Sequence, residues 1–167
     1  MTDLGLTGGE ILQALLKEMS EKLGPARHVR VGFLEGSNCG KHNDQSAPMI
    51  AYFLEHGTVM QSKSTEGEAL LAPGNTHIPP RPFFSTMIAR KSPTWGKLCM
   101  AMLKQAKYNQ TVALHGVGLK IAEQLQQSIQ DWTDPRNADA TIAAKGFDKP
   151  LEDSKNMKRA VSFEVIA

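Results

Sequence analysis

The clearest strand patterns in this sequence lie near its opposite ends. Apolar residues alternate with other residues over 29–34 and again over 161–166, which is the period of a half-buried strand. A sheet built from both segments must be long-range, and the helices between them then gather on one face. These patterns predict an α+β fold, with a small antiparallel or mixed sheet, several helices packed on one face, a long loop and an extended C-terminal arm.

The N-terminal segment has the signature of an amphipathic helix. Thr7 and Glu10 fit the T-x-x-E capping box, in which each side chain satisfies a backbone N–H of the first turn. Gly24-Pro25 ends the helix, because proline cannot continue it. The apolar stripe consists of Ile11, Leu12, Leu15, Leu16, Met19 and Leu23. We therefore expect a helix of roughly 16 residues with one apolar face.

Further helices are predicted between the two strands. They span 49–56, Pro82 to Ile88, Ser92 to Leu103, and 112–132. Gly57 is expected to end the first in the left-handed conformation. Ser92 suits the N-cap of a helix that restarts with Pro93 at its first position. Gly116 and Gly118 lie inside the last helix and indicate either a close packing contact or a break.

The segment 58–76 has few large apolar residues and is expected to form a long loop, with a β-hairpin through 69–72 as the alternative. A two-stranded sheet alone is only marginally stable. We therefore expect the region 58–77 to add strands to the sheet, or a neighbouring subunit to complete it.

Charge and length limit the class of protein. The chain has 167 residues, with 19 Lys and Arg against 17 Asp and Glu and a formal net charge of +2. This length suits one domain with its own core, and the near balance of charge excludes a histone-like polycation or an acidic tail. The first residues lack the basic region of a secretory signal, and no apolar run approaches the roughly 20 residues of a membrane span. With only Cys39 and Cys99 as cysteines, we expect a soluble, reduced, cytosolic protein with no membrane contact.

Motifs for catalysis or metal binding are weak. Cys39, His42, His56 and His77 lack the paired spacing of zinc ligands, and the glycines of 36–41 lack the Walker spacing. No G-x-S-x-G nucleophile elbow occurs. A carboxylate pair of the glycosidase kind stays open, although nothing singles out one pair. We predict no enzymatic activity, no metal and no cofactor.

A loose basic cluster lies on the middle helices. It comprises Arg90, Lys91, Lys97, Lys104 and Lys107. Such spacing is typical of an ordinary solvated face, and no homeodomain, zinc-finger or RNA-binding signature accompanies it. A small nucleic-acid-binding regulatory protein remains the alternative function.

Two segments are candidates for a protein interface. The prolines of 78–84 enforce an extended, polyproline-like chain, which serves either as a rigid linker that aims the next helix or as a pre-ordered contact segment. We divide the chain into an α+β body over 1–133 and an arm with a terminal strand over 134–167, which completes a sheet of its own or of a neighbouring subunit. The predicted interface residues are Ile78, Pro79, Pro80, Arg81, Pro82, Phe83 and Phe84 in the first segment and Ile142, Lys145, Phe147, Pro150 and Leu151 in the arm.

An ordered set of short motifs resembles a known family. The motifs are Val29-Arg-Val-Gly-Phe33, Ala51-Tyr-Phe-Leu-Glu-His-Gly-Thr58, Ile78-Pro-Pro-Arg-Pro-Phe-Phe84, Thr141-Ile-Ala-Ala-Lys-Gly-Phe-Asp-Lys-Pro-Leu151 and Val161-Ser-Phe-Glu-Val165. In this order they resemble the tail-completion and neck proteins of tailed bacteriophages, the virion-morphogenesis group that includes the minor tail protein Z of phage lambda. The resemblance covers most of the chain from residue 29 onward.

The resemblance implies a structural virion protein that acts late in assembly. Such proteins form a ring, commonly a hexamer, at the head-proximal end of the tail. Its neighbours would be a tail terminator or tail tube protein and a head-completion or connector protein, with duplex DNA passing through the lumen without sequence-specific binding. The expected location is the virion neck, and the host cytoplasm before assembly. Family co-occurrence and charge further suggest that Glu55 and Arg81 form a structural pair.

Overall fold

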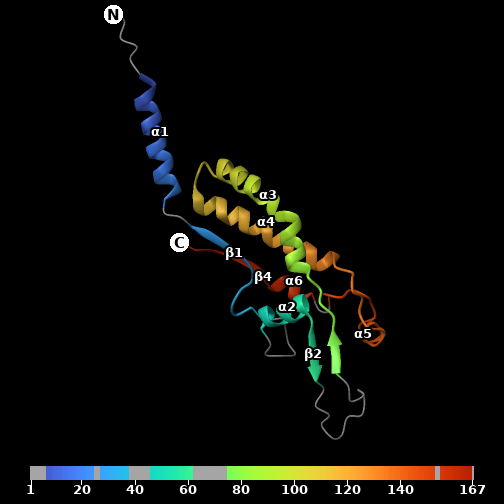
Figure 1. Ribbon diagram of the computed structural model, residues 1–167. Helices are drawn as coiled ribbons and strands as arrows, with labels where there is room; N and C mark the ends of the chain where they lie inside the picture. Colours follow the sequence, from blue (N-terminus) through green and yellow to red (C-terminus); the bar gives the residue numbers. More distant parts are fainter. Residues whose placement is uncertain (1–6, 25–26, 38–45, 62–74, 153–154, 167) are drawn as a thin grey trace, which may run out of the picture.

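The chain is an α+β protein, described here from a computed structural model for residues 7–24, 27–37, 46–61, 75–152 and 155–166. The elements, in order, are α1 (Thr7–Leu23), β1 (His28–Phe33), α2 (Ala47–His56), β2 (Thr58–Gln61), β3 (Asn75–Ile78), α3 (Phe83–Gln105), α4 (Gln110–Asp131), α5 (Asp139–Lys145), α6 (Asn156–Ala160) and β4 (Val161–Ile166). Figure 1 shows their arrangement, with α3 and α4 side by side and α1 leading away from them.

The long-range sheet predicted from the two ends of the sequence is confirmed. β1 and β4 pair antiparallel from His28 opposite Ile166 to Phe33 opposite Val161. α4 packs on this sheet and also on α3. Gly118 permits the close approach, because a Cβ there would lie only 2.4 Å from Cδ2 of Phe163.

The core gathers around the inner face of α4. Leu125 is fully buried and Ile129 is 2% exposed, and both pack in one cluster with Phe83, Met87 and Leu151. The cluster therefore joins α4, the start of α3 and the C-terminal arm. Burial of these side chains is the main favourable term in the folding of this body.

The described strands at the two ends of the region 58–77 form a second sheet and do not extend the first. β2 and β3 pair antiparallel from Thr58 opposite Ile78 to Gln61 opposite Asn75. Residues 69–72, the alternative hairpin, lie outside the described residues. Gly57 precedes β2 with a φ of 74° and a ψ of 164°, so its φ is positive but it is not the left-handed helical stop that we expected. A Cβ at Gly57 would lie 2.8 Å from the carbonyl oxygen of Ile78, so glycine is required here.

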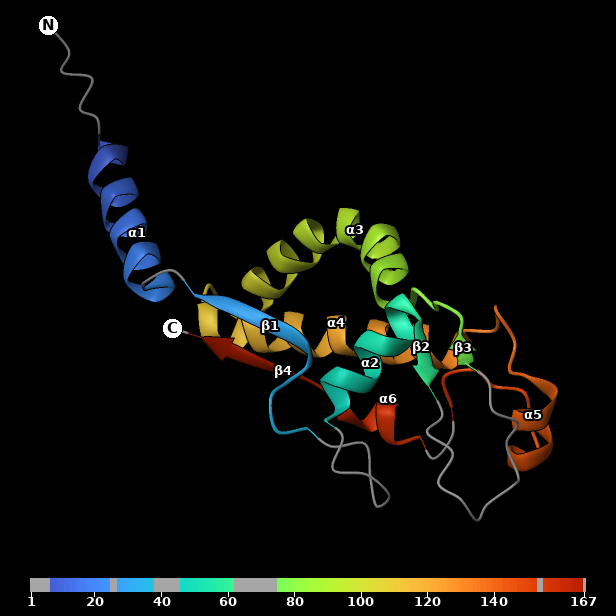
Figure 2. The same cartoon turned by 60° about the horizontal axis from the view of Figure 1, so that its bottom comes forward.

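The prediction of two helices over 82–103 is wrong, because α3 is one continuous helix with Pro93 inside it. Proline lacks the N–H that would bond to the carbonyl four residues earlier and its ring crowds that carbonyl, so a helix bends there. Figure 2 shows α3 strongly curved. The Thr94 hydroxyl donates back to the Lys91 carbonyl at 2.7 Å within this turn.

The arm that begins at residue 134 was expected to be extended, and this is wrong for part of it, because it contains the helix α5. Asp139 lies in the first turn of α5, and Gly146 ends it in the left-handed conformation while its N–H donates to the Ile142 carbonyl. A helix of 7 residues is too short for its apolar spacing to stand out in the sequence. Leu151 and Met157 then join the core cluster, so the arm packs on its own body before β4 begins.

Candidate assembly surface

The N-terminus of α3 is capped by a side chain from α2. The Glu55 carboxylate accepts hydrogen bonds from the backbone N–H groups of Phe84 at 2.9 Å and Ser85 at 3.0 Å, and from the Ser85 hydroxyl at 2.5 Å. The first N–H groups of a helix have no partner within it, and a negative charge there also interacts favourably with the helix dipole. Glu55 therefore fixes α2 against the start of α3.

The expected pair of Glu55 with Arg81 does not form. Arg81 is only 6% exposed, its backbone N–H donates to the Leu54 carbonyl at 2.8 Å, and its Nε donates to the Pro135 carbonyl at 3.3 Å. Burial lowers the pKa of the Arg81 guanidinium, and the charge of Asp148 opposes that shift. The two groups separate because Glu55 satisfies helix N–H groups, whereas Arg81 connects the proline-rich segment to the arm.

Asp148 organises the arm next to Arg81. Its carboxylate accepts from the Asn137 backbone N–H at 3.1 Å and from Nε of Arg136 at 3.2 Å. Nearby, the Lys145 ammonium lies 5.2 Å from the centre of the Phe147 ring and donates to the Lys149 carbonyl at 3.2 Å. Local polar contacts thus hold the segment around α5 in a defined shape.

The predicted interface residues divide into buried and accessible groups. Arg81, Phe83, Pro150 and Leu151 are buried within the chain. In this fold they pack the chain's own interior rather than present a surface to a partner. Phe83 and Leu151 belong to the core cluster, and the Nε of Arg81 donates to the Pro135 carbonyl. The accessible or half-buried members are Ile78, Pro79, Pro80, Pro82, Phe84, Ile142, Lys145 and Phe147.

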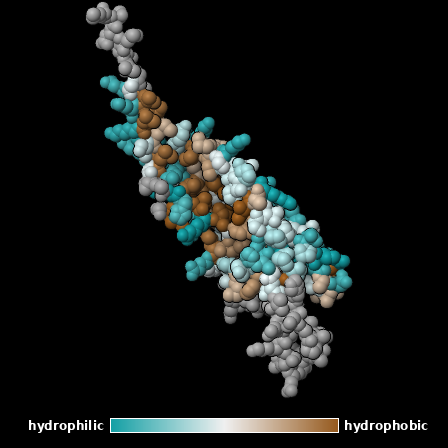
Figure 3. All heavy atoms as spheres, viewed as in Figure 1, coloured by the Kyte–Doolittle hydropathy of each residue, from teal (hydrophilic) through white to brown (hydrophobic). Residues whose placement is uncertain are grey.

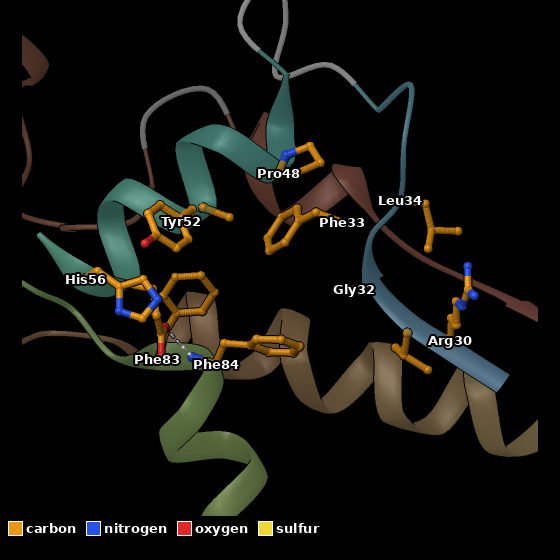
Figure 4. A pocket seen from close by; sticks show the side chains of 12 residues that line it. Arg30, Gly32, Phe33, Leu34, Pro48, Tyr52, His56, Phe83 and Phe84 are labelled. Carbon is orange, nitrogen blue, oxygen red and sulfur yellow. Dashed lines mark hydrogen bonds between the residues drawn. The ribbon is translucent and has the colours of Figure 1, made fainter. Parts of the chain in front are cut away.

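An apolar groove opens between α2, β1 and the start of α3. It has a volume of about 510 Å³, and Figure 4 shows the rings of Phe33, Phe83 and Phe84 gathered in it. Phe33 and Phe83 meet edge to face with ring centres 6.4 Å apart. We call this the α2 groove. Its lining residues are Arg30, Val31, Gly32, Phe33, Leu34, Pro48, Ala51, Tyr52, Glu55, His56, Phe83 and Phe84.

The apolar stripe of α1 is largely uncovered. Leu12, Leu15 and Leu16 are 55%, 51% and 56% exposed. Figures 1 and 2 show α1 standing clear of the other helices in both views. In Figure 3, hydrophobic residues lie along α1 and in a band across the middle of the molecule. Exposed apolar surface of this kind marks interaction sites in soluble proteins.

The basic residues of the middle helices are exposed. Arg90, Lys97 and Lys104 recur every seven residues along α3, and within the described residues none of them forms an ion pair. A smaller cavity of about 340 Å³ lies beside Arg90 and Lys91, between α3 and α4.

Within the described residues, no three His, Cys, Asp or Glu side chains group in a way that could hold a metal ion. Cys99 is a free, half-buried thiol on α3. Among those same residues, no helix combines the length and apolar character needed to cross a membrane.

The α2 groove was not predicted from the sequence. Its signal was present: Pro48, Ala51, Tyr52 and Glu55 recur at helical spacing in α2 and all line the groove. The spacing within α2 could not predict that β1 and α3 form the other walls of the groove.

Comparison with protein-family models, with curated proteins and with solved structures found no match for this chain. Function must therefore be inferred from the residues and their geometry.

Proposed function

We propose that this chain is a structural, non-enzymatic protein of the bacteriophage neck. It forms a ring, most simply a hexamer, at the head-proximal end of the tail, which it completes and joins to the head. The ordered motifs between Val29 and Val165 that resemble tail-completion proteins support this proposal. Those motifs suggest the structural role that is shared by this family, and they do not single out a catalytic residue.

The observation that carries the proposal is the uncovered apolar surface on a chain whose core is already formed. The α1 stripe lies outside the core cluster around Leu125, and the α2 groove opens at the edge of that cluster, with Ala51 and Phe83 belonging to both. Different surfaces that meet head to tail generate a closed ring when the rotation between copies closes. A ring protein needs such a pair of surfaces, and a monomeric one gains nothing from exposing them.

The ring would lie between two sets of partners. A tail terminator or tail tube protein would contact one side, and a head-completion or connector protein the other. Duplex DNA would pass through the lumen without sequence-specific contacts. The formal net charge of +2 suits this role, because a strongly basic lumen would hold phosphates through counterion release.

A joining experiment tests the proposal. DNA-filled heads and tails made without this chain are mixed with the purified protein, and joined particles are counted by electron microscopy. We expect joining only when the protein is present, with a ring visible at the head-proximal end of the tail. Heads and tails that join equally well without it would contradict the proposal; the same mixture lacking the protein is the control.

A nucleic-acid-binding regulator is the second candidate, favoured by the exposed series Arg90, Lys97 and Lys104 on α3. Replacing these three with glutamate should then weaken a duplex-DNA mobility shift and reduce its salt dependence, since each phosphate contact adds to the slope. Replacing the exposed Lys149, Lys155 and Arg159 with glutamate is the control, because it makes the same change in net charge away from α3. An unshifted duplex at low salt would remove this candidate.

A further inference from the structure

This chain has two uncovered apolar surfaces, the leucine stripe of α1 and the α2 groove. We propose that α1 of one copy docks its leucine stripe into the α2 groove of a second copy. The inference rests on the proposed ring function, since it names the contact that would link neighbouring copies.

The α1 side has the form of a helix that binds in a groove. Leu12, Leu15 and Leu16 lie on one face at the i, i+3 and i+4 spacing that serves as anchors in helix-in-groove recognition. All three are more than half exposed. Met19 continues the same face one turn later and is half-buried. A helix with a covered stripe would show these side chains buried, so the face lacks its partner in the single chain.

The groove side is apolar, preformed and open. Phe33, Tyr52 and Phe84 supply most of its aromatic surface, and Figure 4 shows them around a common space. Glu55 is held by α3, so the groove wall is fixed before any partner arrives. Preorganisation of this kind lowers the entropic cost of binding. Tyr52 is 62% exposed at the groove, where a partner helix would cover it.

The geometry favours a second copy over the chain's own α1. In both views α1 leads away from the body and from α2. The helix precedes His28 at the start of β1, whereas the groove residues Gly32, Phe33 and Leu34 lie at the other end of that strand. Arg30, which pairs with Glu164, also lines the groove, so a docked helix from either source lies next to this exposed pair.

Docking into the groove also accounts for both surfaces at once. Bundling of α1 helices from several copies would cover the leucines and leave the α2 groove open. Insertion of α1 into the groove covers both, and it is a head-to-tail contact of the kind that closes into a ring.

Two substitutions test the contact. Leu16→Arg removes the helix anchor, and Tyr52→Arg blocks the groove. Both positions are exposed in the single chain, so the circular dichroism and thermal melting of the dilute monomeric variants should match those of the dilute wild-type monomer. Ala14→Arg, on the opposite side of α1, and Met49→Arg, outside the groove on α2, are matched controls. In sedimentation velocity, each test variant alone should associate at least about 30-fold more weakly, as for loss of an interface hot spot, while the controls assemble.

Mixing the two test variants gives the sharpest result. The Leu16→Arg chain keeps its groove and the Tyr52→Arg chain keeps its α1, so the mixture should form a dimer that cannot grow. If Tyr52→Arg assembles like wild type while Leu16→Arg does not, the α1 helices bundle and the docking is wrong. If each variant forms rings on its own, the docking is wrong, although the chain still assembles into a ring. A wild-type chain that stays monomeric also overturns it, whereas the proposed function is judged separately by the joining of heads to tails.

Discussion

α1 and α4 are both amphipathic helices, of 17 and 22 residues, yet only one has its apolar face covered. In α4, Val117, Leu125 and Ile129 are at most 2% exposed, whereas the leucines of α1 are about half exposed. The difference lies in the neighbours, because α4 contacts α3, β1 and β4 and α1 stands apart. Periodicity therefore establishes that a helix has an apolar face, while tertiary contact decides whether the single chain can bury it.

The largest expected difference between the two helices is in hydrogen exchange. Core helices open only with the whole protein, whereas a helix without tertiary contacts is marginal at this length. In the dilute monomer, the amides of α4 should be protected by at least about 5 kcal/mol more opening free energy than those of α1. Exchange followed by mass spectrometry measures this. Equal protection in the monomer would mean that α1 is packed on the body, and the comparison would fail.

A matched pair of leucine substitutions should show the same contrast in stability. Leu125 is fully buried and Leu16 is 56% exposed. Leu125→Ala should lower the free energy of unfolding by roughly 3 to 5 kcal/mol, because it leaves a cavity in the core. Leu16→Ala should change it by no more than about 0.5 kcal/mol in the monomer. Urea denaturation of both variants at low concentration is the measurement; a large loss in Leu16→Ala would show that its side chain packs on the body.

The glycines of α4 give a smaller contrast within the covered helix. A Cβ at Gly118 would lie 2.4 Å from Cδ2 of Phe163 and 2.9 Å from Cγ2 of Val29, whereas one at Gly116 would meet Sδ of Met102 at 2.9 Å. Gly118→Ala should cost about 1 to 3 kcal/mol through overpacking. Gly116→Ala should be nearly neutral, because the flexible thioether moves and alanine gains up to about 1 kcal/mol of helix propensity. Thermal unfolding of both distinguishes them, and equal costs would refute the packing of α4 on the sheet.

The fold class was predictable because its signals are local. Alternation at both ends gives β1 and β4, and the stripe over 112–132 gives α4. Gly116 and Gly118 indicated either close packing or a break in the helix, and the unbroken α4 and the contacts of Gly118 show that close packing is correct. The continuity of α3 was not predictable, because a proline preceded by serine reads equally as a helix start or as a bend inside a helix.

The candidate surface was predictable only in part. Opposite charge suggested that Glu55 and Arg81 pair, but charge alone ignores the unpaired N–H groups at the start of α3, which Glu55 satisfies. Burial of Leu151 was missed because its partners come from distant parts of the chain. The α2 groove has walls from three segments, so no local pattern contains it.

The smallest expected effect concerns how α1 is held without a core around it. Lys22 donates a hydrogen bond to Glu18 at 2.6 Å, and this bond, followed by the attraction of the two charges, lowers the pKa of Glu18. A carboxyl with a lowered pKa stabilises the helix above its unfolded pKa of about 4.3, and that contribution is lost as the pH falls through the lower folded value. The helicity of α1, followed by NMR chemical shifts in the monomer, should therefore decrease slightly on acidification below about pH 4. In Lys22→Gln this decrease should shrink, while α4 should not respond in either protein. A helicity of α1 with the same pH dependence in Lys22→Gln would show that the pair contributes nothing, and that contacts outside the helix hold α1 in place.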